Sequence, residues 1–161
     1  MKILVAVDGS VYSKRMLAYL SAHDEWLGGA HDYTVVHVVA AVPPRAAAVL
    51  EKAVLAEYYQ EEAEKVLKPI RTFMDKRGIK AQYVVKTGHA SDAISAVAEK
   101  GRFDLIMMGS HGHTALGKLV LGSVATPVLQ LYALNLATTA ALLCAAVLEY
   151  RALPPSSARP A

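Results

Sequence analysis

Residues 103–112 of the chain read Phe-Asp-Leu-Ile-Met-Met-Gly-Ser-His-Gly, and nine residues separate Gly112 from Gly122-Ser123. The apolar run at 103–108 is typical of a buried strand. The glycines after it leave bare backbone where an anion can approach, because a missing Cβ removes the steric barrier and exposes N–H groups. Ser123 offers a hydroxyl donor and can cap the next helix, whose N-terminal dipole favours negative charge. The stretch therefore predicts a phosphate cradle.

Working outward, three more apolar runs predict strands at residues 3–7, 33–39 and 80–86. Helical patterns separate them and are expected from Ser10 to about Leu27, over 47–77 and over 91–100. Pro69 predicts a kink or break in the long second helix. This alternation predicts a single-domain α/β sandwich with a parallel sheet and right-handed crossovers. Such sheets bind ligands at the carboxyl ends of strands, where the strand order reverses.

Composition narrows the class of protein. The chain has 161 residues, 54% of them hydrophobic, which suits one domain with a substantial core. Its formal net charge of +3 is spread along the chain, so a basic nucleic-acid-binding patch is not expected. The single cysteine, Cys144, excludes an intrachain disulfide, and the apolar run before Asp8 is too short for a signal-peptide core. A cytoplasmic location is expected.

Four sequence motifs, in this order along the chain, match the pattern of a known protein family. They are the opening Met-Lys-Ile-Leu-Val-Ala-Val-Asp-Gly-Ser of residues 1–10, Thr-Val-Val-His-Val of 34–38, Lys-Thr-Gly of 86–88 and the glycine pattern described above. Over residues 1–130 this resembles the universal stress protein family, in the subgroup that binds ATP. The resemblance implies an adenine nucleotide alpha hydrolase-like, Rossmann-like fold and a nucleotide-responsive regulator in stress adaptation. It also implies a dimer, little or no hydrolysis, and ATP whose phosphates hold Mg²⁺ or Mn²⁺.

The resemblance also implies which residues bind the nucleotide. Asp8 and Val38 would hold the adenosine end, Met108, Gly109 and Gly112 would line the pocket, and the phosphates would lie on Gly122, Ser123 and Val124. The full set of candidate nucleotide-binding residues adds Val7 and His111 to these: Val7, Asp8, Val38, Met108, Gly109, His111, Gly112, Gly122, Ser123 and Val124.

Other interpretations of single residues remain open. Asp8 precedes a glycine, so its carboxylate can equally well form a turn. His111 and His113 lack a third fixed ligand, so no protein-ligated metal is expected. The stretch 112–118 nearly matches a P-loop, but Leu119 stands where the magnesium-binding hydroxyl is needed. No catalytic residues are assigned, although an ATPase or nucleotidyl transferase on the same fold is the alternative.

The C-terminal segment departs from the family pattern. Pro127 follows Ser123 too closely for a crossover to a fifth parallel strand, so it is expected near the start of the last helix. Residues 119–148 carry no charge and are long enough to span a bilayer, yet polar residues interrupt them. We expect a nucleotide-binding domain at 1–133 and, at 134–161, an apolar helical extension with a disordered tail. An interaction module or membrane-associated protein is the further alternative.

Overall fold

The computed structural model describes residues 1–23, 27, 29–109 and 122–133, with backbone only for the last three. Within them, four parallel strands form one sheet in the order β3-β2-β1-β4. The strands are β1 (Lys2–Val7), β2 (Asp32–Val39), β3 (Ala81–Thr87) and β4 (Leu105–Met108). Each lies within two residues of its predicted position. The predicted α/β sandwich with a parallel sheet is confirmed.

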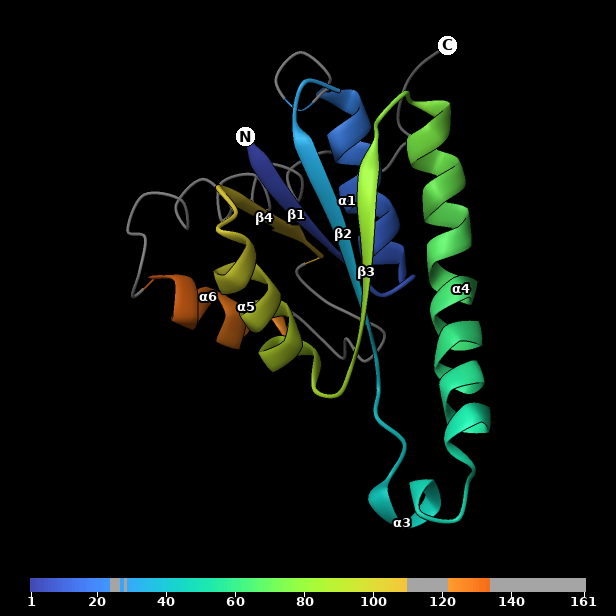
Figure 1. The fold of residues 1–161 in the computed structure, drawn as a ribbon. Helices are drawn as coiled ribbons and strands as arrows, with labels where there is room; N and C mark the ends of the chain where they lie inside the picture. The colour runs from blue at the N-terminus through green and yellow to red at the C-terminus, as the bar shows by residue number, and fades with distance from the viewer. Residues whose placement is uncertain (24–26, 28, 110–121, 134–161) are drawn as a thin grey trace.

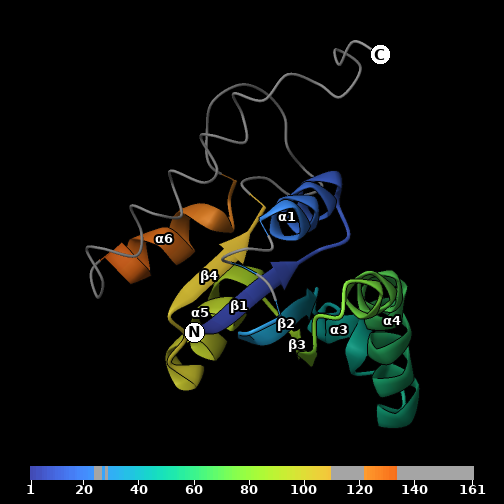
Figure 2. The same ribbon diagram turned by 90° about the horizontal axis from the view of Figure 1, so that it is seen from above.

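Helices cover both faces of the sheet (Figures 1 and 2). One face carries α1 (Val11–Ala22) and α4 (Lys52–Lys76), and the other carries α5 (Ala90–Gly101) and α6 (Ala125–Ala133). Alternate residues of β1 divide between two apolar clusters, with Ile3, Val5 and Val7 facing α1 and α4 and with Leu4 and Ala6 facing α5 and α6. Burial on both faces explains why β1 is a continuous apolar run.

Helix α1 begins as the sequence predicts and ends earlier. Ser10 is its N-cap, and its side chain accepts a hydrogen bond from the amide of Ser13. The helix ends at Ala22, and the amide of His23 bonds back to the carbonyl of Tyr19. The predicted continuation to Leu27 is therefore wrong at His23, whereas Leu27 is itself helical and its amide bonds to the carbonyl of His23 at 2.8 Å. Residues 24–26 lie outside the described residues.

The predicted helix over 47–77 begins later in the structure, at Lys52. A short α3 (Pro44–Ala47) precedes α4, and Glu51 between them adopts the extended conformation of an N-cap. Of the kink or break predicted at Pro69, the break does not occur, because α4 spans 25 residues, Lys52–Lys76, with Pro69 inside it. Pro69 is exposed while Leu67 and Ile70 beside it are buried against the sheet. Core packing on both sides of the proline therefore outweighs the lost backbone hydrogen bond.

The last described helix agrees with its prediction. Pro127 is the third residue of α6, within the first turn, where a proline costs little. Ala125 and Val128 bury this helix against the cluster that also holds Ile94 and Ala98 of α5. The predicted extension over 134–161 lies outside the described residues.

Candidate functional site

The strand order reverses between β1 and β4. From β1 the chain continues to β2 and β3 on one side, whereas β4 pairs with the other side of β1. Ala6 lies in register with Met108, so Asp8 and Gly109 leave the sheet at the same carboxyl edge. In open parallel sheets this switch point is where ligands bind. The structure thus brings the turn at Asp8 and the glycine stretch that begins at Gly109 to the same edge of the sheet.

A closed set of hydrogen bonds holds the turn after β1. The amide of Asp8 donates to Ser13 Oγ at 3.0 Å, and Ser13 Oγ donates back to Asp8 Oδ1 at 2.6 Å. Asp8 Oδ1 also accepts from the amide of Ser10 at 2.9 Å. Gly9 between them has a φ of +79°, which favours glycine. The turn role foreseen for Asp8 is therefore present, and it fixes the carboxylate at the edge of the sheet.

His37 is a site residue that the sequence analysis did not single out. Its side chain is 93% buried, and Nδ1 lies 2.8 Å from the carbonyl oxygen of Val7, the last residue of β1. We infer that Nδ1 donates this bond, because a carbonyl can only accept. The bond fixes the peptide that precedes Asp8. A histidine inside a run of valines in a buried strand was the available signal.

Three predicted pocket residues meet in one apolar cluster. Val38 at the end of β2, Met108 at the end of β4 and Val124 before α6 all pack in the cluster on the α5 and α6 face. Val7 faces the opposite cluster, beneath α1 and α4. Val38, Met108 and Val124 thus share a face of the sheet, while Val7 reaches the site through its backbone carbonyl.

The second glycine stretch lies at the start of α6. The carbonyl of Gly122 accepts a hydrogen bond from the amide of Thr126 at 3.0 Å, so helical bonding begins at Gly122. Ser123, the predicted cap, is exposed directly before this helix. The first N–H groups of a helix have no partner within it and suit an anion. His111 and Gly112 lie outside the described residues.

A serine, a histidine and an aspartate also meet at the start of α5. Ser91 Oγ lies 2.8 Å from His89 Nδ1 and 3.1 Å from Asp92 Oδ1. In a nucleophilic triad the histidine uses one ring nitrogen for the serine and the other for the carboxylate. Here Nδ1 of His89 faces both, since it lies 3.6 Å from Asp92 Oδ1, and Ser91 is 98% buried. These positions do not form a nucleophilic triad, and Asp92 lies in the first turn of α5, where the helix dipole favours a carboxylate.

Two further findings concern the part of the chain that the structure describes. No three His, Cys, Asp or Glu side chains there are grouped so that they could hold a metal ion. None of the described helices has the length and apolar character needed to span a membrane.

Comparison with known proteins places the chain in a family. The model of the universal stress protein family matches residues 1–135. The universal stress protein Slr1230 of Synechocystis is 33% identical over 129 residues, which is 80% of this chain and 39% of that protein. The match covers less than half the length of each of the three curated relatives, at 39%, 45% and 43%.

Solved structures agree with this result. The structure of MJ0577, a universal stress protein of Methanocaldococcus jannaschii, superimposes with a TM-score of 0.67 at 28% identity and covers 80% of this chain and 88% of its own. An Arabidopsis family member with AMP bound shares the fold with a TM-score of 0.57 at 17% identity, covering 81% of this chain and 84% of its own. The chain belongs to the universal stress protein family.

Proposed function

We propose that this protein binds ATP at the carboxyl edge between β1 and β4 and acts as a nucleotide-responsive regulator in stress adaptation. The observation that carries the proposal is the convergence of the Asp8 turn, Met108 and the start of α6 at the switch point of the sheet. The AMP bound to the Arabidopsis relative supports an adenine nucleotide as the ligand.

The residues present fit a nucleotide. Val38 and Met108 offer apolar surface on which a base can pack, and the Asp8 carboxylate is placed to accept hydrogen bonds from an amino group or ribose hydroxyls. Gly109 and Gly122 allow the backbone to approach a phosphate closely. The backbone amides of Ser123 and Val124, just before α6, can donate hydrogen bonds to the same phosphate. His111 and Gly112 remain sequence-based assignments. Phosphate oxygens would supply most ligands to Mg²⁺ or Mn²⁺.

We expect little or no hydrolysis. Turnover needs a base positioned to activate water and a metal held in a fixed place. Within the described residues, the serine, histidine and aspartate at the start of α5 have the wrong geometry, and no metal-binding group is present. We propose residues 1–133 as the nucleotide-binding unit.

Nucleotide binding can be tested in two steps. Mass spectrometry of small molecules released from denatured protein identifies the bound nucleotide, and calorimetry gives its affinity. Gly122→Val and Gly109→Val should each lower ATP affinity at least tenfold, about 1.4 kcal/mol, because a branched side chain would stand where phosphate approaches. The control Gly29→Ala should not, since an added Cβ there comes no closer than 3.6 Å to the Gly78 carbonyl oxygen.

Two outcomes would overturn the proposal. Unchanged ATP affinity in folded Gly122→Val and Gly109→Val protein would mean that the pocket is misplaced. Phosphate release at the usual enzyme rate, on the order of 10 per second, would make the protein an ATPase.

A further inference from the structure

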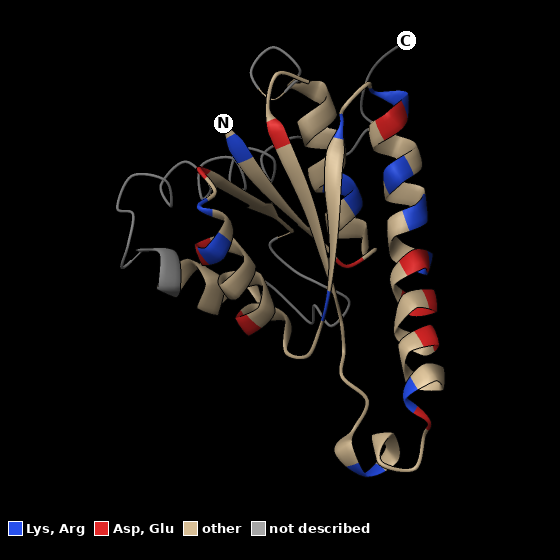
Figure 3. Cartoon of the chain, in the orientation of Figure 1, with Lys and Arg blue, Asp and Glu red and all other residues tan. Residues whose placement is uncertain are grey.

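The outer face of α4 has charge and apolar character that suit a second copy of itself. Acidic residues gather mainly on the N-terminal half of α4 and basic residues on the C-terminal half (Figure 3). Residues 52–64 hold four glutamates and one lysine, a net charge of −3. Residues 65–76 hold three lysines, one arginine and one aspartate, a net charge of +3. A helix with opposite charges at its two ends complements an antiparallel copy of itself.

One continuous stripe on this helix faces solvent. Ala63, Leu67, Ile70 and Met74 pack on the sheet. Residues spaced by three or four share a face of a helix, and the opposite face therefore carries an outer stripe. Together with the residues on its borders, this outer stripe consists of ten exposed residues: Glu51, Val54, Glu57, Tyr58, Glu61, Lys65, Lys68, Pro69, Thr72 and Lys76.

The apolar members of this region are unusual for a surface. Seven large hydrophobic residues are exposed in the described part of the chain, and four of them lie within residues 49–58. Val49 is 84% exposed, Val54 49% and Tyr58 43%; Leu50 is the fourth. They lie in the turn after α3 and at the start of α4, which project beyond the carboxyl edge of the sheet (Figure 1). Clustered exposed apolar side chains indicate an interaction surface.

We propose that two copies of this chain associate through their α4 helices, antiparallel, about a two-fold axis near residue 63. In an antiparallel pair, residue numbers rise along one helix while they fall along the other. The two residue numbers in each contact therefore have a nearly constant sum. A sum of 125–127 matches every position of the outer stripe with a suitable partner: Glu51 with Lys76, Val54 with Thr72, Glu57 with Lys68, Tyr58 with Pro69, and Glu61 with Lys65.

The pairing is chemically consistent at each position. Three of the five contacts join a carboxylate to an ammonium group, and the two-fold axis repeats each of them. Tyr58 would lay its ring on the exposed ring of Pro69, and Val54 would meet the methyl group of Thr72. Antiparallel helices also align their dipoles favourably. A heterologous partner would need the same charge reversal along its own helix, which is why we assign a second copy.

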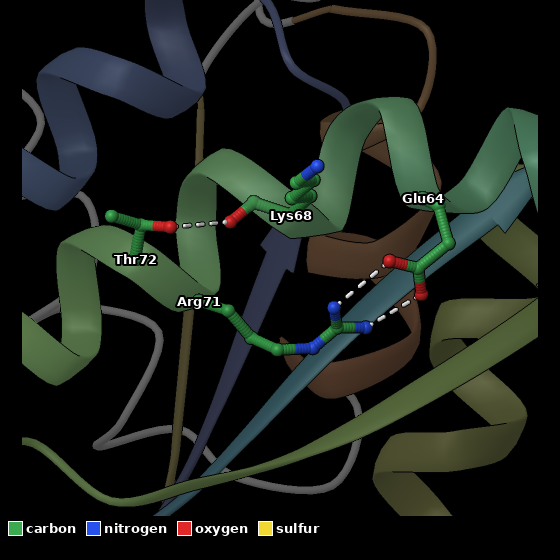
Figure 4. Close-up of polar contacts among 4 residues, drawn as sticks. All are labelled: Glu64, Lys68, Arg71 and Thr72. Atoms are coloured by element: carbon green, nitrogen blue, oxygen red, sulfur yellow. Dashed lines mark hydrogen bonds and ion pairs between the residues drawn. The ribbon is translucent and has the colours of Figure 1, made fainter.

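Contacts within α4 involve one of the pairing charges, Lys65, and two other residues, Glu64 and Arg71, that bond to each other. Arg71 makes two hydrogen bonds to Glu64, at 2.9 and 2.7 Å, and this lowers the pKa of Glu64. Figure 4 shows Lys68 between them in sequence with its side chain directed away from that pair. Lys65 bonds to Glu62, three residues earlier on its own helix, and would share its charge with Glu61 of the second copy.

Charge reversal in the full-length protein tests the surface. Sedimentation velocity should show a concentration-dependent dimer that weakens with added salt, because exposed charge pairs are screened. Glu57→Lys and Lys68→Glu should each raise the dimer dissociation constant about tenfold, since each change turns two attractive contacts into repulsive ones. The double variant should restore most of the affinity. Glu99→Lys with Lys100→Glu, an exposed pair on α5, is the matched control and should change nothing.

Cross-linking tests the register. A carbodiimide joins a carboxylate to an amine without a spacer. Glu57 and Lys68 lie 11 residues apart on one helix, about 16 Å along the axis, which is too far for that bond to form within a copy. A Glu57–Lys68 cross-link joining ¹⁵N-labelled and unlabelled peptides is therefore expected. Circular dichroism confirms that each variant is folded. A monomer at every concentration, or a dimer that both single variants leave unchanged, overturns the proposal.

Discussion

Replacing Gly9 by alanine should destabilise the protein more than replacing Gly78, although both glycines have similar backbone conformations. Their φ angles are +79° and +68°. A left-handed conformation costs an ordinary residue about 1–2 kcal/mol, and stiffening of the unfolded chain offsets about 0.4–1 kcal/mol. At Gly78 an added Cβ meets nothing within 4 Å, so the loss there should be about 0.5–1 kcal/mol.

At Gly9 the same Cβ would lie 3.2 Å from Cγ2 of Val66 on α4. That contact is tight, and relieving it requires the Val66 side chain, α4 or the Asp8 turn to shift. Overpacking of this kind costs about 1–3 kcal/mol, and we expect the lower end because the Val66 side chain can shift. Gly9→Ala should therefore lose about 1.5–2 kcal/mol in all. Since Gly9 adjoins Asp8, this variant should also weaken ATP binding, whereas Gly78→Ala should not.

Urea unfolding monitored by circular dichroism gives the free energies, provided the slope with urea stays constant. Combining Gly9→Ala with Val66→Ala removes the close contact, so the double-mutant cycle should show a coupling of about 1 kcal/mol. Equal losses for the two alanine variants, together with no coupling to Val66, would refute the idea that the Asp8 turn is packed against α4.

Three more predictions concern the site, the core and the tail. His37→Leu leaves the buried Val7 carbonyl without its hydrogen-bond donor. The free energy of urea unfolding should fall by about 1–3 kcal/mol, and ATP binding measured by calorimetry should weaken. His37→Asn, whose side-chain amide can donate, should recover part of both. Burial raises the pKa of Tyr33 to about 12. Folding therefore favours the protonated phenol, and this stabilisation is fully present below pH 10. Up to about 2–3 kcal/mol of stability should be lost as the pH rises toward 12. The variant Tyr33→Phe should not show this loss. Deleting residues 134–161 should leave ATP affinity unchanged by calorimetry, and loss of binding would mean that the tail supports the pocket.

The strands could be predicted because their physical environment is uniform. A central parallel strand is buried on both faces, so every residue must be apolar, and residues 3–7 show this directly in the sequence. The edge strand β3 is more exposed and alternates in polarity, yet glycines at both ends still mark it: Gly78 before it and Gly88 after it. Chain order and the right-handed crossover rule predicted a parallel sheet, whereas the order β3-β2-β1-β4 was not predicted.

Helix ends and breaks were predicted less well, because they depend on tertiary contacts. The propensity of Pro69 indicates a break, but the buried residues Leu67, Ile70 and Met74 hold both sides of it on the sheet. At the start of α4 a break occurs that was not predicted. Residues 48–51 contain no proline or glycine, so the sequence predicts a continuous helix there. Glu51 nevertheless adopts an extended conformation there and separates α3 from α4.

That the candidate site residues meet at one edge of the sheet was predictable from the sequence, but the contacts among them were not. Asp8 and the glycines after β4 were identified because chain order and the switch-point rule bring them together. The bonds that fix Asp8 were not, since Ser13 reaches it only once α1 has turned it inward. His37 was missed for a related reason: its role depends on the register that sets it beside Val7, and register is a property of the sheet.

The close approach of Gly9 to Val66 gives these separate features a common physical basis. Gly9 lies in the turn that holds Asp8, at the edge of the proposed nucleotide site, and Val66 lies on the inner side of α4. The opposite side of the same helix carries the outer stripe assigned to the second copy. A displacement of the Asp8 turn toward the sheet or away from it therefore has to be accommodated by α4 or by the Val66 side chain, because packed interiors have little free volume. If nucleotide binding and association of two copies are coupled through this contact, each must change the affinity of the other by the same factor.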